Sequence, residues 1–375
     1  MIPLNQNLNA LKRSQIRVFT NLAKATPGCA SLTIGEPDLD TPGDIKLAAM
    51  AALQDNQTHY APNQGTPALR SAIADHETRR GNPTAPEQVL VTVGACQALF
   101  TALLGILNPG EEVIVPTPGF GLYETIATIA GAGTVPLDVS KTNFQITREA
   151  LNAVITEKTK AIVINSPCNP TGVIFNEESL AAVKEAVLGK PIFVICDNVY
   201  RDLSYAPCPD ISCDPELKEQ MILCQSFSKP WAMTGWRLGY LTCPDYVMDR
   251  LLLLSAATIT AVPTFLQEAA ITALKTPVEP MRQIYAGRRE YVTGRLRAMG
   301  LSFPEPEGAF YVFVNIAKFG MDSATFCTRM IQEGLLAAVP GACFGADDYI
   351  RLSYCYGDEE LKTGLDRLEA FIASL

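Results

Sequence analysis

Two apolar runs in the middle of the chain, KAIVIN at residues 160–165 and PIFVICD at residues 191–197, decide the fold class. Between them lie a turn-rich loop and EESLAAVKEAVL at residues 177–188, which has a helical pattern. Neither run alternates polar with apolar residues, which is typical of strands buried on both faces of a sheet. Strand, helix and strand in this order predict a right-handed crossover between two parallel strands.

The same pattern extends in both directions from this unit. Upstream, VLVTVG at residues 89–94 and EEVIVP at residues 111–116 are each followed by a helix-like segment. Downstream, QMILCQS at residues 220–226 adds another apolar run. Strands that alternate with helices predict an α/β fold with a mostly parallel sheet. In such sheets ligands bind beyond the carboxyl ends of the strands, so residues at those ends are the first candidates for a site.

The pattern changes after residue 277. A charged helical stretch at residues 281–299 leads to the strand-like FYVFVNI at residues 310–316 and YIRLSYC at residues 349–355, and helical segments follow each of these. We therefore expect a large α/β domain at residues 41–277 and a smaller α+β domain at residues 278–375. Residues 1–40 are too few to fold alone and are expected to pack onto the smaller domain.

Composition and charge exclude several classes of protein. The chain has 375 residues, of which 48% are hydrophobic, and a net charge of −9. The negative charge and the lack of a basic run argue against nucleic-acid binding. We find neither a signal peptide nor a stretch of about 18 apolar residues, so we expect a cytoplasmic protein without a membrane segment. Two histidines and eleven cysteines without a CxxC pair predict no metal site and no disulfide framework.

The segment SFSKPWAMTGWRLGY at residues 226–240 is the most specific one in the chain. Lys229 follows a buried strand, where desolvation lowers the pKa of an amine and makes the nucleophilic neutral form accessible. Ser226, Ser228 and Arg237 supply the hydroxyls and the cation that a phosphate needs. Taken alone, Lys229 is equally well explained as a surface lysine at the end of a strand.

Polar residues also follow other strands of the predicted sheet. Asp197 ends PIFVICD, and a protonated pyridine nitrogen would be a natural partner for a carboxylate in this apolar setting. Tyr200 lies three residues further on, and Asn169 lies in the loop NSPCNPTG at residues 165–172; both are placed to donate to a phenolic oxygen. The ordinary alternatives are a helix cap for Asp197 and turn chemistry for Asn169.

Two further strand ends complete the set. TVGACQAL at residues 92–99 is a strand–glycine–helix junction, and the first N–H groups of a helix bind phosphate. Phe120 follows a third strand, where an aromatic ring stacks well on a flat cofactor, although a core phenylalanine explains it almost as well. A GxGxxG fingerprint is absent, so a dinucleotide site is not supported. Together these residues are the parts of a pyridoxal phosphate site.

With these residues in this order, the chain resembles the fold-type I pyridoxal phosphate aminotransferases of class I/II. The resemblance covers nearly the whole chain and rests on an ordered series of motifs: LTIGEPDLDTP at residues 32–42, HYAPNQGTPALRSAI at residues 59–73, NPTG, SKPWAMTGWRLGY, GAFYVF and YIRLSY. It implies a large domain with a mostly parallel seven-stranded sheet sandwiched by helices. The implied activity is transfer of an amino group between an L-amino acid and a 2-oxo acid by a ping-pong mechanism.

The resemblance also implies roles for individual residues. Lys229 matches the Schiff-base lysine, and Lys229, Asp197 and Tyr200 are the expected catalytic residues. The implied cofactor-binding residues are Ala95, Cys96, Phe120, Asn169, Asp197, Tyr200, Ser226, Lys229 and Arg237. Tyr60 is also an implied cofactor-binding residue, because it matches a tyrosine that reaches the cofactor phosphate of the neighbouring subunit, so a homodimer is implied. Gly35, Asn169 and Arg351 match substrate-binding positions, with Arg351 clamping the α-carboxylate.

Two departures from the family pattern and several alternatives stay open. Asn198 stands where the family often has glutamate, and Cys96 stands where it usually has glycine or serine. A C–S β-lyase on the same fold is the nearest alternative activity. A pyridoxal phosphate-sensing regulator is a remote one, because this acidic chain has no room for a DNA-binding domain. The wording of the motifs is closest to enzymes acting on aspartate, aromatic amino acids or N-acetyl-diaminopimelate. Arg17 and Arg201 are candidates to read the substrate side chain, although a surface arginine explains each of them better.

Overall fold

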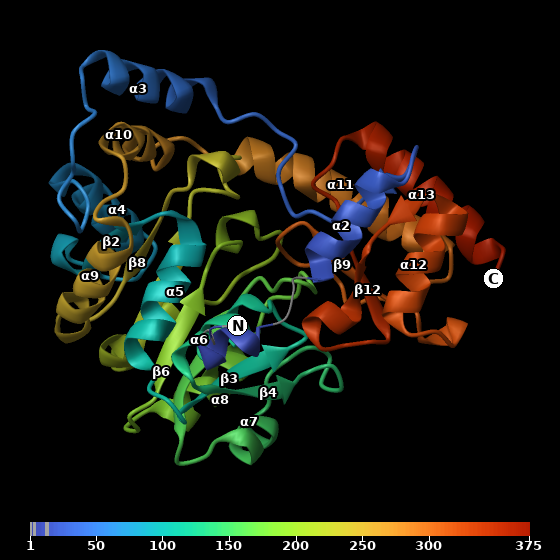
Figure 1. Cartoon of the computed structure of the whole chain (residues 1–375), viewed down its shortest axis with the longest axis horizontal. Helices are drawn as coiled ribbons and strands as arrows, with labels where there is room; N and C mark the ends of the chain where they lie inside the picture. The colour runs from blue at the N-terminus through green and yellow to red at the C-terminus, as the bar shows by residue number, and fades with distance from the viewer. Residues whose placement is uncertain (1, 3–4, 12–14) are drawn as a thin grey trace.

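A seven-stranded sheet lies at the centre of the described part of the chain, residues 2, 5–11 and 15–375 of a computed structural model (Figure 1). The strands are β2 (Val89–Thr92), β3 (Glu112–Thr117), β4 (Gly133–Asp138), β5 (Thr159–Asn165), β6 (Phe193–Asp197), β7 (Met221–Ser226) and β8 (Gly239–Thr242), in the order β2-β8-β7-β6-β5-β3-β4. Strands β4, β3, β5, β6 and β7 are parallel, whereas β8 is antiparallel to both of its neighbours. The predicted mostly parallel sheet is therefore confirmed.

Two strands of this sheet were not predicted from the sequence. Strand β4 lies at the edge, is largely uncovered and contains Pro136, which has no N–H to donate and is tolerated at an edge. Strand β8 has only four residues and overlaps the end of the segment at residues 226–240, whose other features point to a site. Both strands depend on neighbours distant in sequence, which a local pattern does not reveal.

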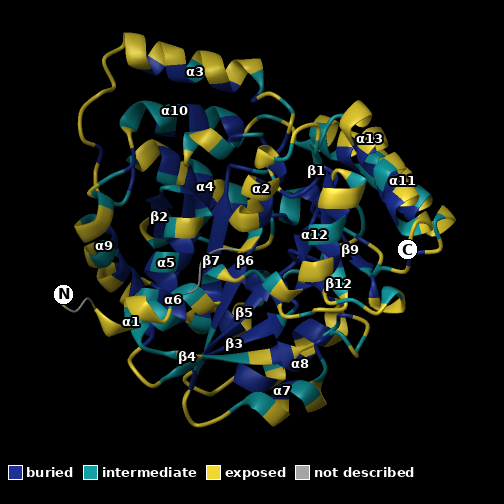
Figure 2. Ribbon diagram, turned by 45° about the vertical axis from the view of Figure 1, so that its right-hand side comes forward, coloured by how far each residue is buried: buried dark blue, intermediate teal, exposed yellow. Residues whose placement is uncertain are grey.

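Helices cover both faces of the sheet, which explains the unbroken apolar runs. Val163, Ile195 and Ile222 face a core that α5 (Gly94–Ile106), α6 (Leu122–Ala130) and α9 (Asp245–Ile259) complete. The alternate residues Val194 and Leu223 face the opposite core, built with α7 (Arg148–Val154) and α8 (Glu177–Val187). In Figure 2 these strands are almost wholly buried. Apart from the edge strand β4, the sheet thus has no solvated face, and its polar residues gather where the strands end.

A second unit contains the C-terminal residues. Strands β9 (Tyr311–Asn315), β12 (Tyr349–Ser353) and β11 (Val339–Pro340) form an antiparallel sheet, and α11 (Glu279–Ala298), α12 (Ser323–Gly334) and α13 (Asp358–Ala373) pack beside it. All of these elements except the two-residue strand β11 coincide with the predicted segments. Near the N-terminus, α2 (Gln15–Ala25) packs against α12, and β1 (Ala30–Ser31) pairs in parallel with β10 (Leu336–Ala337). This part of the N-terminal segment therefore lies against the C-terminal unit (Figure 1).

The remaining helices lie at one end of the large unit. Helix α3 (Gly43–Gln54) packs on α10 (Thr264–Ala273) beside α4 (Pro67–Arg79), while the short α1 (Gln6–Asn9) contacts α6. Figure 2 shows that much of α3 is exposed. Its exposed residues include the apolar Leu47, Met50 and Leu53. No helix among the described residues is both long and apolar enough to cross a membrane.

Candidate active site

A cavity of about 520 Å³ lies where the carboxyl ends of the central strands meet the C-terminal unit and α2. All but one of the predicted site residues line it: Gly35, Ala95, Cys96, Phe120, Asn169, Asp197, Tyr200, Ser226, Lys229, Arg237 and Arg351. These residues come from positions spread over more than 300 residues of sequence. The parallel strands bring them together because their carboxyl ends lie at one edge of the sheet.

Lys229 lies just beyond β7, with its side chain largely enclosed. Its Nζ donates a hydrogen bond of 2.5 Å to the carbonyl oxygen of Gly35 and lies 5.7 Å from the centre of the Phe310 ring. Burial lowers the pKa of Lys229, although the nearby Cys355, Glu36 and Cys96 oppose this. No carboxylate among the described residues forms an ion pair with it. The neutral, nucleophilic amine is therefore easier to reach here than in a solvated lysine.

Asp197 is the last residue of β6 and is only 4% exposed. One of its oxygens accepts a hydrogen bond of 2.6 Å from the hydroxyl of Tyr123, and the other accepts one of 3.3 Å from the backbone N–H of Val199. Burial raises the pKa of Asp197 to about 6, although the Tyr123 hydrogen bond opposes this. A cationic partner in the cavity would therefore be needed to keep Asp197 fully ionised.

The raised pKa predicts how the stability of the cofactor-free protein depends on pH. Folded Asp197 holds its proton more tightly than the unfolded chain, so its contribution to stability is full below about pH 4 and is lost as the pH rises through about 6. The shift corresponds to roughly 3 kcal/mol. Urea unfolding at about pH 4.5 and about pH 7 should show roughly two-thirds of this loss in the wild type and none of it in Asp197→Asn; identical pH dependence in both would contradict the assignment.

Arg351 in β12 is a buried guanidinium, 2% exposed. It donates hydrogen bonds of 2.8 Å to Asn169 Oδ1 and 2.6 Å to the carbonyl oxygen of Thr33. Its Nε has no hydrogen-bond partner, and it forms no ion pair with any described residue. The rings of Tyr311 and Phe344 lie 4.4 and 5.0 Å from the guanidinium carbon. A buried cation with an unused donor is suited to a carboxylate from a ligand.

Two tyrosines at the cavity escaped the sequence analysis. Tyr123 lies on α6 and binds Asp197, and Tyr311 lies on β9, where its hydroxyl is 2.7 Å from that of Tyr200. Both sit in apolar runs and look like core residues in the sequence. For Tyr123 a signal existed, because it follows the candidate Phe120 by only three residues, and the centres of the two rings lie 6.0 Å apart. For Tyr311 none did, because β9 meets the site only through the tertiary fold.

A group of donors lies together at the start of α5. The helix begins at Gly94, so the first N–H groups at Ala95 and Cys96 have no partner within the helix. Ser226 is buried nearby, and Arg237 donates to the carbonyl oxygens of Thr234 and Val93 without forming an ion pair among the described residues. A Cβ on Gly94 would lie 2.8 Å from a terminal nitrogen of Arg237. These donors match an anion such as phosphate.

Gly35 is a position where the cavity leaves no room for a side chain. A Cβ there would lie 1.8 Å from the hydroxyl oxygen of Tyr311, which is itself buried. We expect Gly35→Ala to lower the free energy of unfolding by roughly 1–3 kcal/mol, measured by urea denaturation. Gly43→Ala is the matched control, because its Cβ would meet nothing within 4 Å. Equal unfolding midpoints for Gly35→Ala and Gly43→Ala would refute this account.

The other three candidates from the sequence differ in their position relative to the cavity. Tyr60 does not line the cavity and is 91% exposed in the single chain. Arg201 does not line it either, because its guanidinium contacts Asp210 in an ion pair; its candidacy as a reader of the substrate is therefore wrong. Arg17 on α2 does line the cavity and is exposed. The departure at Cys96 places a free, exposed thiol at the cavity wall.

Comparison with known proteins agrees with this geometry. Residues 27–368 match the family model for aminotransferase class I and II. The chain is 38% identical to an aspartate aminotransferase of Pyrococcus abyssi (98% of this chain, 97% of that protein) and 36% identical to a probable N-acetyl-LL-diaminopimelate aminotransferase of Bacillus subtilis (98% and 95%). A crystal structure of an aromatic aminotransferase from Pyrococcus horikoshii, 37% identical, superposes with a TM-score of 0.90 over 95% of this chain and 99% of the other.

The chain therefore belongs to the class I and II aminotransferases, a family of pyridoxal phosphate-dependent transferases of amino groups.

Proposed function

We propose that the protein binds pyridoxal 5'-phosphate and transfers an amino group between an L-amino acid and a 2-oxo acid. The observation that carries this proposal is the arrangement of charged groups in one cavity. Lys229, Asp197, Arg237 and Arg351 all line it, and none of them forms an ion pair with a described residue. Asp197 and Arg351 are buried, and buried charges without partners are costly, so a ligand with complementary charges would stabilise this arrangement.

The donor set fits the proposed cofactor. The α5 N-terminus at Ala95 and Cys96, Ser226 and Arg237 would hold its phosphate. The carboxylate of Asp197 would pair with the ring nitrogen, and Phe120 would stack on the ring. Tyr200 and Asn169 would donate to the ring oxygen; Asn169 Oδ1 already accepts from Arg351, which leaves its amide N–H₂ free to donate. When bound, the protonated ring stabilises negative charge at the substrate Cα.

The protein side chains would then divide the work of proton transfer. Arg351 would bind the α-carboxylate in two-point contact and orient the Cα–H bond toward Lys229. The Lys229 amine, with its lowered pKa, would remove this proton and donate it again later in the reaction. One side chain would thus act first as a general base and then as a general acid. Tyr123 would hold Asp197 in position through its hydrogen bond.

A single half-reaction tests the proposed activity. The holoenzyme is mixed with an amino acid and no oxo acid, and the products are separated. Transamination predicts stoichiometric pyridoxamine 5'-phosphate and the matching 2-oxo acid. Release of a thiol and pyruvate from a cysteine conjugate, without pyridoxamine phosphate, would instead show a C–S β-lyase.

The charge of α2 supports a substrate with a second acidic group. Arg17 and Lys24 lie seven residues apart, on one side of α2, and both line the cavity. If Arg237 binds the cofactor phosphate and Arg351 the α-carboxylate, these two cations are left for the substrate side chain. We therefore place aspartate and N-acetyl-diaminopimelate ahead of aromatic amino acids. A panel of donors with 2-oxoglutarate as acceptor tests this order, and a higher kcat/KM for aromatic donors would reverse it.

We further propose a homodimer in which Tyr60 reaches the site of the second copy. Tyr60 and one apolar side of α3 (Leu47, Met50, Leu53) are exposed in the single chain, as expected for side chains that a partner covers. Sedimentation should give a mass twice that of the chain; a monomer at micromolar concentration would refute the dimer.

A further inference from the structure

The turn after β6 is held only in part by hydrogen bonds of the sheet. It holds both Asp197 and Tyr200, but only Asp197 belongs to the strand. The backbone N–H of Asn198 makes the last bond to the sheet, 3.0 Å to the carbonyl oxygen of Cys224, and the N–H of Arg201 then bonds back to the carbonyl oxygen of Asn198 at 3.0 Å. The sheet therefore does not hold Tyr200, and other contacts must.

Asp210 supplies contacts on both sides of Tyr200. One of its carboxylate oxygens, Oδ2, accepts a hydrogen bond of 2.9 Å from the Asn198 side chain and also contacts the guanidinium of Arg201. Its other oxygen accepts a bond of 2.9 Å from the backbone N–H of Ser212. The Asp210 side chain is only 5% exposed. One buried oxygen atom thus closes the turn from residue 198 to residue 201.

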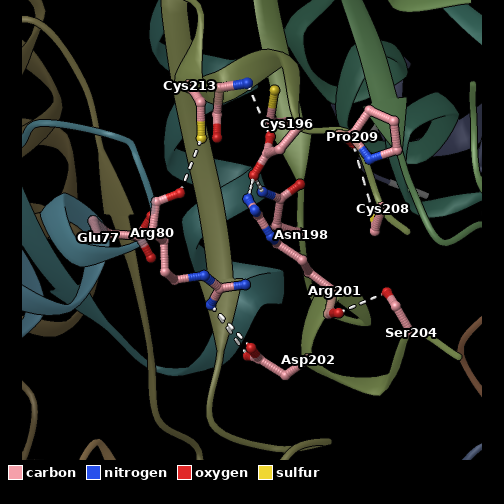
Figure 3. A network of polar contacts seen from close by, with 12 residues as sticks. Glu77, Arg80, Cys196, Asn198, Arg201, Asp202, Ser204, Cys208, Pro209 and Cys213 are labelled. Atoms are coloured by element: carbon pink, nitrogen blue, oxygen red, sulfur yellow. Dashed lines mark hydrogen bonds and ion pairs between the residues drawn. The ribbon is translucent and has the colours of Figure 1, made fainter. Parts of the chain in front are cut away.

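A second ion pair holds the next residue of the same segment. Asp202 lies 3.0 Å from Arg80 at the end of α4, and both side chains are largely buried (Figure 3). This pair fixes the segment beyond the turn, whereas Asp210 acts on the two residues that flank Val199 and Tyr200. The neutral amide at Asn198 fits this arrangement, because a carboxylate at that position would repel Asp210 instead of donating to it.

We propose that Asp210 is a positioning residue that fixes Tyr200 against the cofactor ring by closing the turn at residues 198–201. The inference rests on the proposed function. Asp210 itself does not line the cavity, so its effect on the site must pass through Asn198 and Arg201.

The test uses a signature that a merely structural residue would not change. Tyr200 is proposed to donate to the ring oxygen, so Tyr200→Phe in the holoenzyme should shift the pH midpoint of the cofactor's visible band. We expect Asp210→Ala to shift the midpoint in the same direction, by at least half as much. In the double variant Asp210→Ala/Tyr200→Phe, no further shift is expected beyond that of Tyr200→Phe, because both changes remove the same contact, that of the Tyr200 hydroxyl with the ring oxygen.

Asp214→Ala is the matched control. Asp214 also accepts a hydrogen bond from a backbone N–H, that of Glu216, at 3.0 Å and also forms an ion pair, at 2.8 Å with Lys184, but it touches no residue of the turn. We expect it to leave the midpoint unchanged even if it lowers the melting temperature. The exchange variant Asn198→Asp/Asp210→Asn keeps one amide and one carboxylate in contact and should restore the wild-type midpoint more closely than Asp210→Ala.

The outcomes separate the two proposals. A wild type without a visible band in the presence of pyridoxal phosphate would overturn the proposed function, and this inference with it. A wild-type band that moves in Tyr200→Phe but stays in place in Asp210→Ala would overturn the inference alone. Additive shifts in the double variant, or an equal shift in Asp214→Ala, would also overturn it.

Discussion

Lys229→Ala is expected to remove the visible absorbance of the holoenzyme and to lower kcat by on the order of 10⁴-fold or more. The amine is the group in the cavity with a lowered pKa and a clear approach to a bound ligand, and alanine leaves nothing to bond to an aldehyde or to carry a proton. The loss should therefore fall on kcat more than on the KM of the amino acid. Absorbance spectra and single-turnover kinetics measure the two effects.

A control variant separates this effect from general damage. Lys160→Ala removes a lysine from β5, where its Nζ lies 3.9 Å from Glu111 and outside the cavity. It should retain the visible band and nearly all activity. If Lys229→Ala keeps both the band and the turnover, the assignment of Lys229 is wrong.

Arg351→Lys is expected to lower kcat/KM for an amino acid by roughly 10²–10³-fold, because a lysine cannot make the planar two-point contact of a guanidinium. The surroundings of Arg351 do not compensate for its replacement by lysine. Arg351 is buried between two aromatic rings and held by Asn169 and the carbonyl oxygen of Thr33, so a shorter, differently shaped cation cannot take its place.

The matched experiment removes the α-carboxylate of the substrate instead of the arginine. The amine that lacks the α-carboxylate should be a poor substrate of the wild type, and Arg351→Lys should handle that amine nearly as well as the wild type does. Steady-state kinetics with the amino acid and the amine, on both enzymes, form a complete cycle. Equal losses for the amino acid and the amine would show that Arg351 does not bind the carboxylate.

Much of the site follows from residues that lie at strand ends. Asp197 stands out because a charged group after four or more apolar residues needs a special reason to be there, and Lys229 stands out because it follows a strand expected to be buried. The ordered motifs then add Arg351 and Gly35, which no local pattern marks. Arg201 shows the limit of this reasoning. In the sequence it was a candidate to bind a substrate, but in the structure it forms an ion pair with Asp210, nine residues away.

The sequence by itself determined the fold class and the chemical identity of the main site residues. Unbroken apolar runs require burial on both faces of a sheet, and that requirement leaves few architectures. The tertiary structure decided which groups touch. It put Tyr123 on Asp197, Tyr311 on Tyr200 and Asp210 across the turn at residues 198–201, and it buried Arg351 without an acidic partner among the described residues. The physical reason is range: hydrophobic patterning acts along neighbouring residues, whereas hydrogen bonds and ion pairs join atoms that only the packed chain brings within about 3 Å.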